Sequence, residues 1–230
     1  MRKKYFTAQK RRAAPIFSHT QEVQIFAAKM GDDRVVVKVP KRLPPKGSGA
    51  LTAFSKQYAV EGFASHSLFY ALFPEHAIKP KAITFVEDDE KRLYGVATEI
   101  VQNRDKEYKK FVRAAYTEGK EGRMTLGEIK ENSKTKKYFT FVENIAWKTQ
   151  QFIWHETGIW ADKHPINIAF VEGNPVFFEI DSIDTKKLET YIERKIDNPQ
   201  KAERLKRWIQ QLPKDENGAW NKTALHDSKN

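Results

Sequence analysis

The sequence predicts an α+β protein in which a small antiparallel sheet carrying one helix is followed by a mostly helical part. Two observations predict this class. Apolar residues alternate over short segments of the amino-terminal part, whereas longer stretches with helical spacing dominate the rest. The composition, with 40% hydrophobic and 31% charged residues, is that of a folded protein with a well-solvated surface. We expect two parts, residues 1–101 and residues 102–230.

The amino-terminal part is expected to consist of strands around one helix. Segments rich in β-branched and aromatic residues predict strands at 15–22, 23–30, 35–39, 82–87 and 93–101. Gly31 with two aspartates, and the acidic residues 87–90, predict the tight turns. From Leu51 onwards apolar residues recur at steps of three or four until Pro74, which predicts a helix that ends there because proline cannot continue it.

The carboxy-terminal part is predicted to contain a polar, mobile segment, 117–137. A long helix follows from about Tyr138 to Glu156, and Gly158 is expected to end it. One apolar stripe of this helix is predicted to contain Phe141, Ile145, Lys148 and Phe152.

After the long helix, the sequence predicts a hairpin and then a helical tail. Two short apolar runs, 166–171 and 176–180, are separated by Glu172-Gly173-Asn174-Pro175, a composition typical of hairpin turns. The residues 186–212 are predicted to be helical and amphipathic, and those beyond Pro213 to be loose.

The charge and cysteine content restrict the environment and the partners of the chain. It carries a formal net charge of +11 and no cysteine, so disulfides and thiolate metal sites are excluded. It shows neither an apolar run long enough to span a bilayer nor a hydrophobic signal segment after Met1–Tyr5, so we expect a cytoplasmic protein, of the producing cell or of a host cell.

The positive charge is concentrated near the amino terminus. Residues 1–50 contain twelve Lys/Arg and three Asp/Glu. This surplus either keeps the surface solvated or binds an anionic regulator, which would be an inositol phosphate, an anionic lipid or a nucleic acid. The residues expected to carry it are Arg2, Lys3, Lys4, Lys10, Arg11, Arg12, Lys41, Arg42 and Lys46.

The most informative motif lies between the long helix and the hairpin. Asp162 is followed by Lys163-His164-Pro165-Ile166-Asn167, and the returning strand of the hairpin ends at Asp181. This order resembles the protein-kinase superfamily, in which an Asp is followed by four residues, an Asn and then a hairpin that ends in Asp. The form Asp-x-His-Pro-x-Asn is especially similar to the aminoglycoside-phosphotransferase-like and other atypical kinases. The resemblance covers roughly residues 35–184.

The resemblance implies a kinase-like bilobal fold and an ATP-dependent phosphotransferase that uses Mg²⁺ or Mn²⁺. Asp162 would orient the acceptor hydroxyl and accept its proton, while Asn167 and Asp181 would bind the metal ions. His164 would brace the loop by hydrogen bonding. We expect the acceptor to be a Ser or Thr of a protein, and a small-molecule hydroxyl is the alternative.

A second group of residues is expected to bind the nucleotide. Val36 and Lys38 share one face of a strand that resembles the lysine-bearing strand of kinases. Glu61 lies on the apolar stripe of the next helix, where a carboxylate requires a cationic partner, so we expect a Lys38–Glu61 ion pair. Glu75 is an alternative partner. Glu99 and Val101 complete the cofactor-binding set that the resemblance implies.

The sequence also departs from the kinase pattern. No glycine occurs between Ala14 and Gly31, where a glycine-rich loop would cover the phosphates, and Ser18–Gln21 would occupy the hairpin tip. Trp160-Ala161 precedes Asp162, and the few residues after Asp181 predict an abbreviated C-lobe. These departures keep open a catalytically silent kinase-like binding module.

Two further classes of enzyme compete with this interpretation. Basic charge with clustered carboxylates also suits a metal-dependent nuclease, although Glu179-Ile180-Asp181 lacks the lysine that commonly accompanies such carboxylates. A zinc hydrolase is disfavoured because His155-Glu156 is not followed by a histidine one helical turn later.

Overall fold

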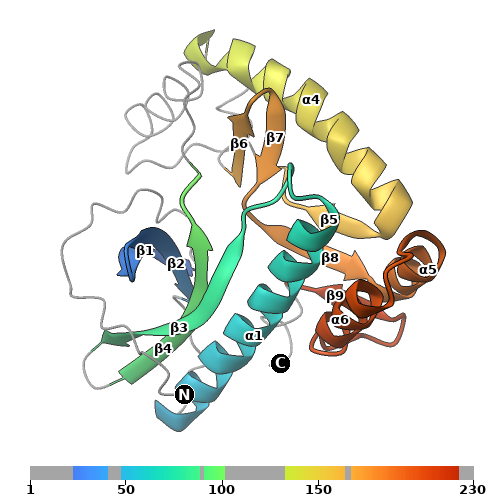
Figure 1. The fold of residues 1–230 in the computed structure, drawn as a ribbon. Coiled ribbons are helices and arrows are strands. Elements are labelled where there is room, and N and C mark those ends of the chain that lie inside the picture. The colour runs from blue at the N-terminus through green and yellow to red at the C-terminus, as the bar shows by residue number, and fades with distance from the viewer. Residues whose placement is uncertain (1–22, 41–47, 89–90, 102–132, 164–166, 223–230) are drawn as a thin grey trace. The chain divides into compact units, whose positions relative to one another are not determined.

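A computed structural model of the chain describes residues 23–40, 48–88, 91–101, 133–163 and 167–222. The chain divides into two compact units, the first formed by Met1–Ser67 with Lys79–Ile100 and the second by Leu68–Ile78 with Val101–Asn230. Helices and antiparallel sheets occur together in the described residues, which confirms the α+β class (Figure 1).

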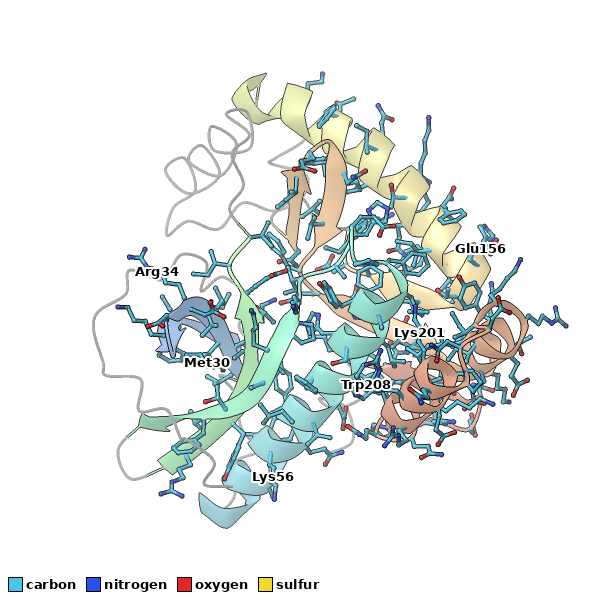
Figure 2. The ribbon with its side chains drawn as sticks, in the orientation of Figure 1. Met30, Arg34, Lys56, Glu156, Lys201 and Trp208 are labelled. Carbon is cyan, nitrogen blue, oxygen red and sulfur yellow. The ribbon has the colours of Figure 1, made fainter. Side chains whose placement is uncertain are left out.

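The first unit contains one four-stranded antiparallel sheet. Its strands follow the order β1-β2-β4-β3, with β1 at Val23–Met30, β2 at Asp33–Pro40, β3 at Pro80–Asp88 and β4 at Lys91–Glu99. The β1–β2 turn, flanked by Met30 and Arg34 (Figure 2), contains Gly31 at a φ of 64°, a conformation that glycine adopts without steric cost. The predicted strand 15–22 lies outside the described residues.

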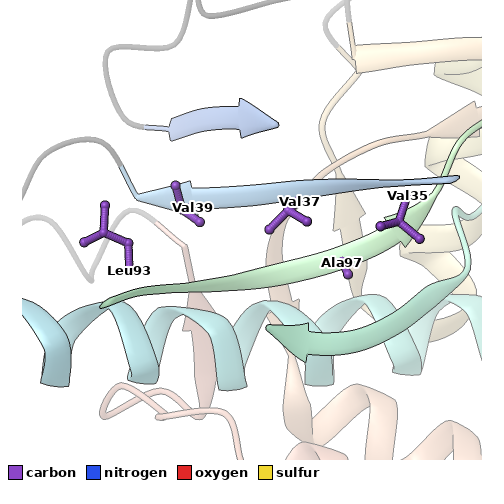
Figure 3. Packing of buried hydrophobic residues seen from close by; sticks show 5 residues of the cluster. All are labelled: Val35, Val37, Val39, Leu93 and Ala97. Carbon is purple, nitrogen blue, oxygen red and sulfur yellow. The ribbon is translucent and has the colours of Figure 1, made fainter. Parts of the chain in front are cut away.

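One face of this sheet forms an apolar core. Because side chains alternate along a strand, Val35, Val37 and Val39 point to the same face of β2, and all three are buried. Leu93 and Ala97 of β4 complete the cluster (Figure 3), since Ala97 is directly opposite Val37 in the register.

Helix α1, Ser48–Leu72, packs on the opposite face of the sheet. A Cβ atom at Gly62 would lie 3.0 Å from Val96 Cγ2, so the helix and β4 are in close contact there. In addition, the Tyr94 N–H donates to Ser55 Oγ over 3.2 Å. The helix begins three residues before the predicted start and ends before Pro74, as predicted.

The second unit combines helices with two small antiparallel sheets. Its helices are α4 at Ser133–Thr157, α5 at Thr185–Lys195 and α6 at Pro199–Ile209. One sheet has the order β5-β8-β9, formed by Ile159–Ala161, Ile180–Asp184 and Ala219–Asn221. The other is the hairpin of β6, Ile168–Val171, and β7, Asn174–Phe177.

The predicted hairpin and helix stop are both confirmed. Glu172 and Gly173 connect β6 to β7 with φ values of 52° and 86°, as a two-residue hairpin loop with two positive φ angles requires. Gly158 ends α4 with a φ of 73°, a conformation that favours glycine. However, α4 already begins at Ser133, five residues before the predicted start at Tyr138, while 117–132 lie outside the described residues.

The predicted apolar stripe of α4 is wrong. Phe141 and Phe152 are 43% and 58% exposed, and Lys148 is also exposed. The helix instead buries a neighbouring stripe that contains Val142, Ala146, Gln150, Ile153 and Thr157. The small and polar members of this stripe allow α4 to approach β5 closely, which two phenylalanines would prevent.

The tail, predicted to be helical, consists of two helices, α5 and α6. Asn198 and Pro199 divide it, because Asn198 Oδ1 accepts the Lys201 N–H and Pro199 occupies the first turn of α6. The pKa of Tyr191 on α5 is raised above its usual value, mainly because the phenol is partly buried. The negative charge of Glu156, near the end of α4 (Figure 2), raises it further.

The end of the described chain is partly ordered as a strand. The prediction of a loose end beyond Pro213 is therefore wrong for the residues that form β9, which pairs with β8. No described helix combines the length and the apolar character that crossing a bilayer requires.

Candidate functional site

The site is built around the end of β5, which a buried glutamine on α4 holds in place. Gln150 Nε2 donates to the Ile159 carbonyl over 3.2 Å, and Gln150 Oε1 accepts the Ala161 N–H over 2.9 Å. Both ends of the amide are therefore satisfied by one strand, as a fully buried polar side chain requires. Asp162 is the next residue along the chain.

Asp162 and Asn167 are in direct contact. Asn167 Nδ2 donates to Asp162 Oδ2 over 2.5 Å. The amide nitrogen of Asn167 therefore faces Asp162, and the amide oxygen Oδ1 is turned elsewhere. The Asn167 carbonyl accepts the Phe178 N–H over 2.8 Å, which ties this end of the loop to the hairpin. His164, predicted to brace the loop, lies outside the described residues.

Asp181 occupies an irregular position on the strand beside Asp162. In the β5–β8 register Trp160 is opposite Ser182 and Ala161 is opposite Ile180, so Asp181 is the extra residue of a β-bulge. Bulges change the direction of a side chain and are frequent next to functional sites. The Asp162 N–H donates to the Glu179 carbonyl over 2.9 Å, so the backbone segments that carry both aspartates are hydrogen-bonded to each other.

The three predicted residues therefore lie on backbone segments that hydrogen bonds join, and their donor atoms suit a hard cation. Two carboxylates and an amide oxygen are ligands that Mg²⁺ accepts. Within the described residues, His, Cys, Asp and Glu side chains alone form no group of three that could hold a metal ion. A metal site at Asp162 and Asp181 thus depends on the amide oxygen of Asn167.

The hairpin beside the site is anchored by residues that follow α1. His76 Nδ1 donates to the Pro175 carbonyl over 2.9 Å, and the His76 carbonyl accepts the Phe177 N–H over 2.9 Å. The ring of Phe177 is fully buried and lies 6.3 Å from the ring of Phe69. These contacts anchor β7, the strand that leads towards Asp181, within the second unit.

An aromatic cluster that the sequence reasoning missed holds the residue after Asp162. The Lys163 ammonium lies 3.2 Å from the ring centroid of Trp147, a cation–π contact. Trp160 lies edge-on to both Trp147 and Trp154, at 6.0 Å and 5.7 Å between centroids. The sequence spacing could have indicated this cluster, because Trp147 and Trp154 are two helical turns apart and so lie on the same face of the long helix.

Glu179 is a second residue whose importance was missed. Its side chain is 8% exposed and forms an ion pair with Lys222, whose side chain is 16% exposed. A carboxylate between Phe178 and Ile180 indicates that a partner is needed, but no local pattern points to a lysine 43 residues later.

In the first unit, Lys38 and Glu61 both lie where α1 meets the sheet. Lys38 is directly opposite Val96 in the register, so both side chains point to the face that Gly62 of α1 contacts. Glu61, next to Gly62, is 1% exposed, and its Oε1 accepts a hydrogen bond from Gln57 Nε2 over 2.9 Å. The Lys38–Glu61 ion pair stays a prediction.

The remaining predicted residues have varied surroundings. Glu99 Oε1 accepts the Lys79 N–H over 2.9 Å, so this carboxylate fixes the start of β3. Val101 is half-buried. Glu75, the alternative partner of Lys38, belongs to the second unit, and its Oε1 lies 3.8 Å from His76 Nε2. The basic residues predicted to bind an anion lie outside the described residues.

Comparisons of the chain with protein-family models, with curated proteins and with solved structures gave no match.

Proposed function

We propose that the protein is an ATP-dependent phosphotransferase with a kinase-like bilobal fold, which transfers the γ-phosphate to a hydroxyl group. The observation that carries the proposal is the hydrogen bond between Asn167 and Asp162 on a segment that is paired with the bulged strand of Asp181. Phosphoryl transfer requires a carboxylate at the incoming hydroxyl and hard oxygen ligands for the metal, and these residues supply both.

The order of elements in the first unit supports the same proposal. The strand with Lys38 is followed by a helix with the buried Glu61 and then by two strands that complete the sheet. The kinase resemblance implies this order, because its lysine strand precedes the helix that carries the paired glutamate. Lys38 and Glu61 are therefore the proposed nucleotide-binding pair.

In the proposed reaction, each residue of the second unit has a separate task. Asp162 accepts a hydrogen bond from the acceptor hydroxyl and takes its proton as the new oxygen–phosphorus bond forms, while the bond between the γ-phosphorus and the β,γ-bridging oxygen breaks and ADP leaves. Asn167 keeps Asp162 oriented through Nδ2 and offers Oδ1 to a cation. Asp181 offers a second oxygen ligand. A bound Mg²⁺ or Mn²⁺ would neutralise charge on the ATP phosphates.

A Ser or Thr of a protein is the proposed acceptor. Strand β8 leads directly into α5, which Asp184 caps through a 3.0 Å hydrogen bond from the Lys187 N–H, and α6 follows closely. Between Ile180 and Ile209 these two short helices follow β8, which leaves little chain for the helical insertion that the resemblance implies for small-molecule kinases.

Incubation with γ-labelled ATP and Mg²⁺, alone and with a cell lysate, tests the function. We expect metal-dependent transfer of label to protein in the wild type, and transfer that is lower by about 10²- to 10⁴-fold in D162A. D197A is a matched control, because Asp197 is an exposed carboxylate between α5 and α6. Label on a small metabolite would favour the small-molecule alternative. Nucleotide binding without transfer would favour the silent module, and cleavage of added nucleic acid would favour the nuclease.

A further inference from the structure

The last described residues, 215–222, form a folded element that we call the C-terminal strap. Asp215 Oδ1 accepts the N–H groups of Asn217 and Ala219 over 2.9 Å and 2.8 Å, which closes a tight turn. Strand β9 then pairs with β8, and Trp220, opposite Ile183, is buried. The strap therefore extends the sheet that carries Asp181.

Lys222 ends the described strap and contacts the segment of Asp181 twice. Its N–H donates to the Asp181 carbonyl over 2.8 Å. Its ammonium forms the largely buried ion pair with Glu179. The Glu179 carbonyl in turn accepts the Asp162 N–H. A single residue is thus linked to both proposed site aspartates, to one directly and to the other through Glu179.

The charge of Lys222 matters because the surroundings of Glu179 are poor in water. Without the Lys222 ammonium, the buried Glu179 carboxylate would lose the ion pair that holds it and would move towards solvent. That movement would disturb the backbone at 179–181, where the bulge sets the direction of Asp181. Residues that orient metal ligands in this indirect way commonly affect metal affinity or activity by about 10- to 100-fold.

We propose that Lys222 is a positioning residue of the metal site and acts through Glu179. The proposal rests on the proposed function, because the site that it positions is the one formed by Asp162, Asn167 and Asp181. It assigns no contact between Lys222 and the nucleotide. It also gives the strap a role, namely to bring a cation from the end of the described chain to the bulged strand.

The test compares four variants of the full chain: K222M, K222R, the double variant E179Q/K222M, and the control K214M. Lys214 pairs with Glu189 over 3.1 Å, but both side chains are about 40% exposed, so its removal should have little effect. Calorimetry gives the Mg²⁺ concentration at half-maximal ATP binding, and thermal unfolding gives Tm. All binding is measured well below the lowest Tm.

We expect K222M to raise the required Mg²⁺ concentration by about tenfold or more. K222R should restore most of the affinity because it keeps the charge. E179Q/K222M should recover Tm and part of the affinity, since no buried charge is left without its partner. A merely structural role would lower Tm in K222M but leave the Mg²⁺ dependence of the folded protein unchanged.

The outcomes separate this inference from the function on which it rests. Wild-type protein that binds no nucleotide would overturn the proposed function and, with it, this role of Lys222. Wild-type binding combined with an unchanged Mg²⁺ dependence in K222M would overturn the inference alone. If K222M did not fold, the double variant decides, and an Mg²⁺ dependence equal to that of the wild type in it would also overturn the inference.

Discussion

Asp162 and Asp181 lie on hydrogen-bonded backbone segments but are held by different contacts. Asp162 is held by Asn167 Nδ2 on its side chain and by the Glu179 carbonyl on its backbone, so its carboxylate has a restricted orientation. Asp181, in the bulge, is held through its carbonyl by Lys222. Binding and turnover should therefore respond differently when one of the two aspartates is removed.

The first prediction separates these two aspartates. D181A should abolish Mg²⁺-dependent ATP binding, because it removes a charged ligand of the proposed metal site. D162A should bind ATP nearly as the wild type does, while transfer falls by about 10²- to 10⁴-fold, the usual contribution of a positioned base. Calorimetry and single-turnover transfer measure the two effects. Equal affinity for ATP and Mg²⁺ in wild type and D181A would show that Asp181 is not a metal ligand.

The second prediction concerns the proposed pair of Lys38 and Glu61. K38M should severely impair phosphoryl transfer, because it removes the cation that is proposed to contact the nucleotide phosphates. E61Q should impair transfer less, because its amide can still hold the ammonium by a hydrogen bond. K56M is the control, since Lys56 is an exposed lysine of α1 (Figure 2). Unchanged transfer in K38M would contradict the assignment and favour the silent-module alternative.

At the scale of elements, β5 depends on α4 for its position. This short strand ends immediately before Asp162, and the side chain of Gln150 forms hydrogen bonds with one carbonyl and one N–H group of the strand. The helix buries a stripe that includes Gln150 and leaves Phe141 and Phe152 exposed. The side of α4 that is buried therefore depends on the hydrogen bonds from Gln150 to β5 as well as on hydrophobicity.

The third prediction tests this dependence. Q150L keeps a similar volume but leaves two buried backbone groups of β5 without partners, each of which costs about 1–3 kcal/mol. Urea unfolding should show a correspondingly lower free energy of unfolding. The matched control is Q151L at the next, exposed position, which should change stability by less than about 0.5 kcal/mol. Equal stability of the two variants would contradict the role of Gln150.

At the scale of the whole molecule, the distribution of charge is the dominant feature. The chain carries +11 formal charges, and residues 1–50 supply most of the surplus. Exposed basic residues also occur on α5 and α6, among them Arg194, Lys195 and Arg207. This second group allows local recognition of an anion to be distinguished from general attraction by net charge.

The fourth prediction uses that distinction. Changing Lys41, Arg42 and Lys46 to Glu should weaken the binding of an inositol phosphate, of anionic vesicles or of nucleic acid, and wild-type binding should fall steeply with salt. Changing Arg194, Lys195 and Arg207 to Glu alters the net charge equally and should have a smaller effect. Titrations at several salt concentrations measure both. Salt-insensitive binding, or none to any of the three anions, would leave the basic residues as solvated surface only.

The sequence by itself determined those features that depend on neighbouring residues. Strand β1 has the bounds predicted for it, the β6–β7 hairpin forms at Glu172 and Gly173, and α4 ends at Gly158. Each of these depends on side-chain alternation or on a local backbone conformation that glycine favours. The motif of Asp162, Asn167 and Asp181 could likewise be recognised in the sequence, because it is defined by the types of these residues and their spacing.

Only the tertiary structure decided which distant residues complete these elements. The buried stripe of α4 and the pairing of β9 with β8 depend on partners far away in the chain, so neither periodicity nor composition could predict them. The bulge at Asp181 and the Glu179–Lys222 ion pair are further examples. The physical reason is that burial creates the requirement for a partner, whereas only the path of the folded chain determines which residue meets it.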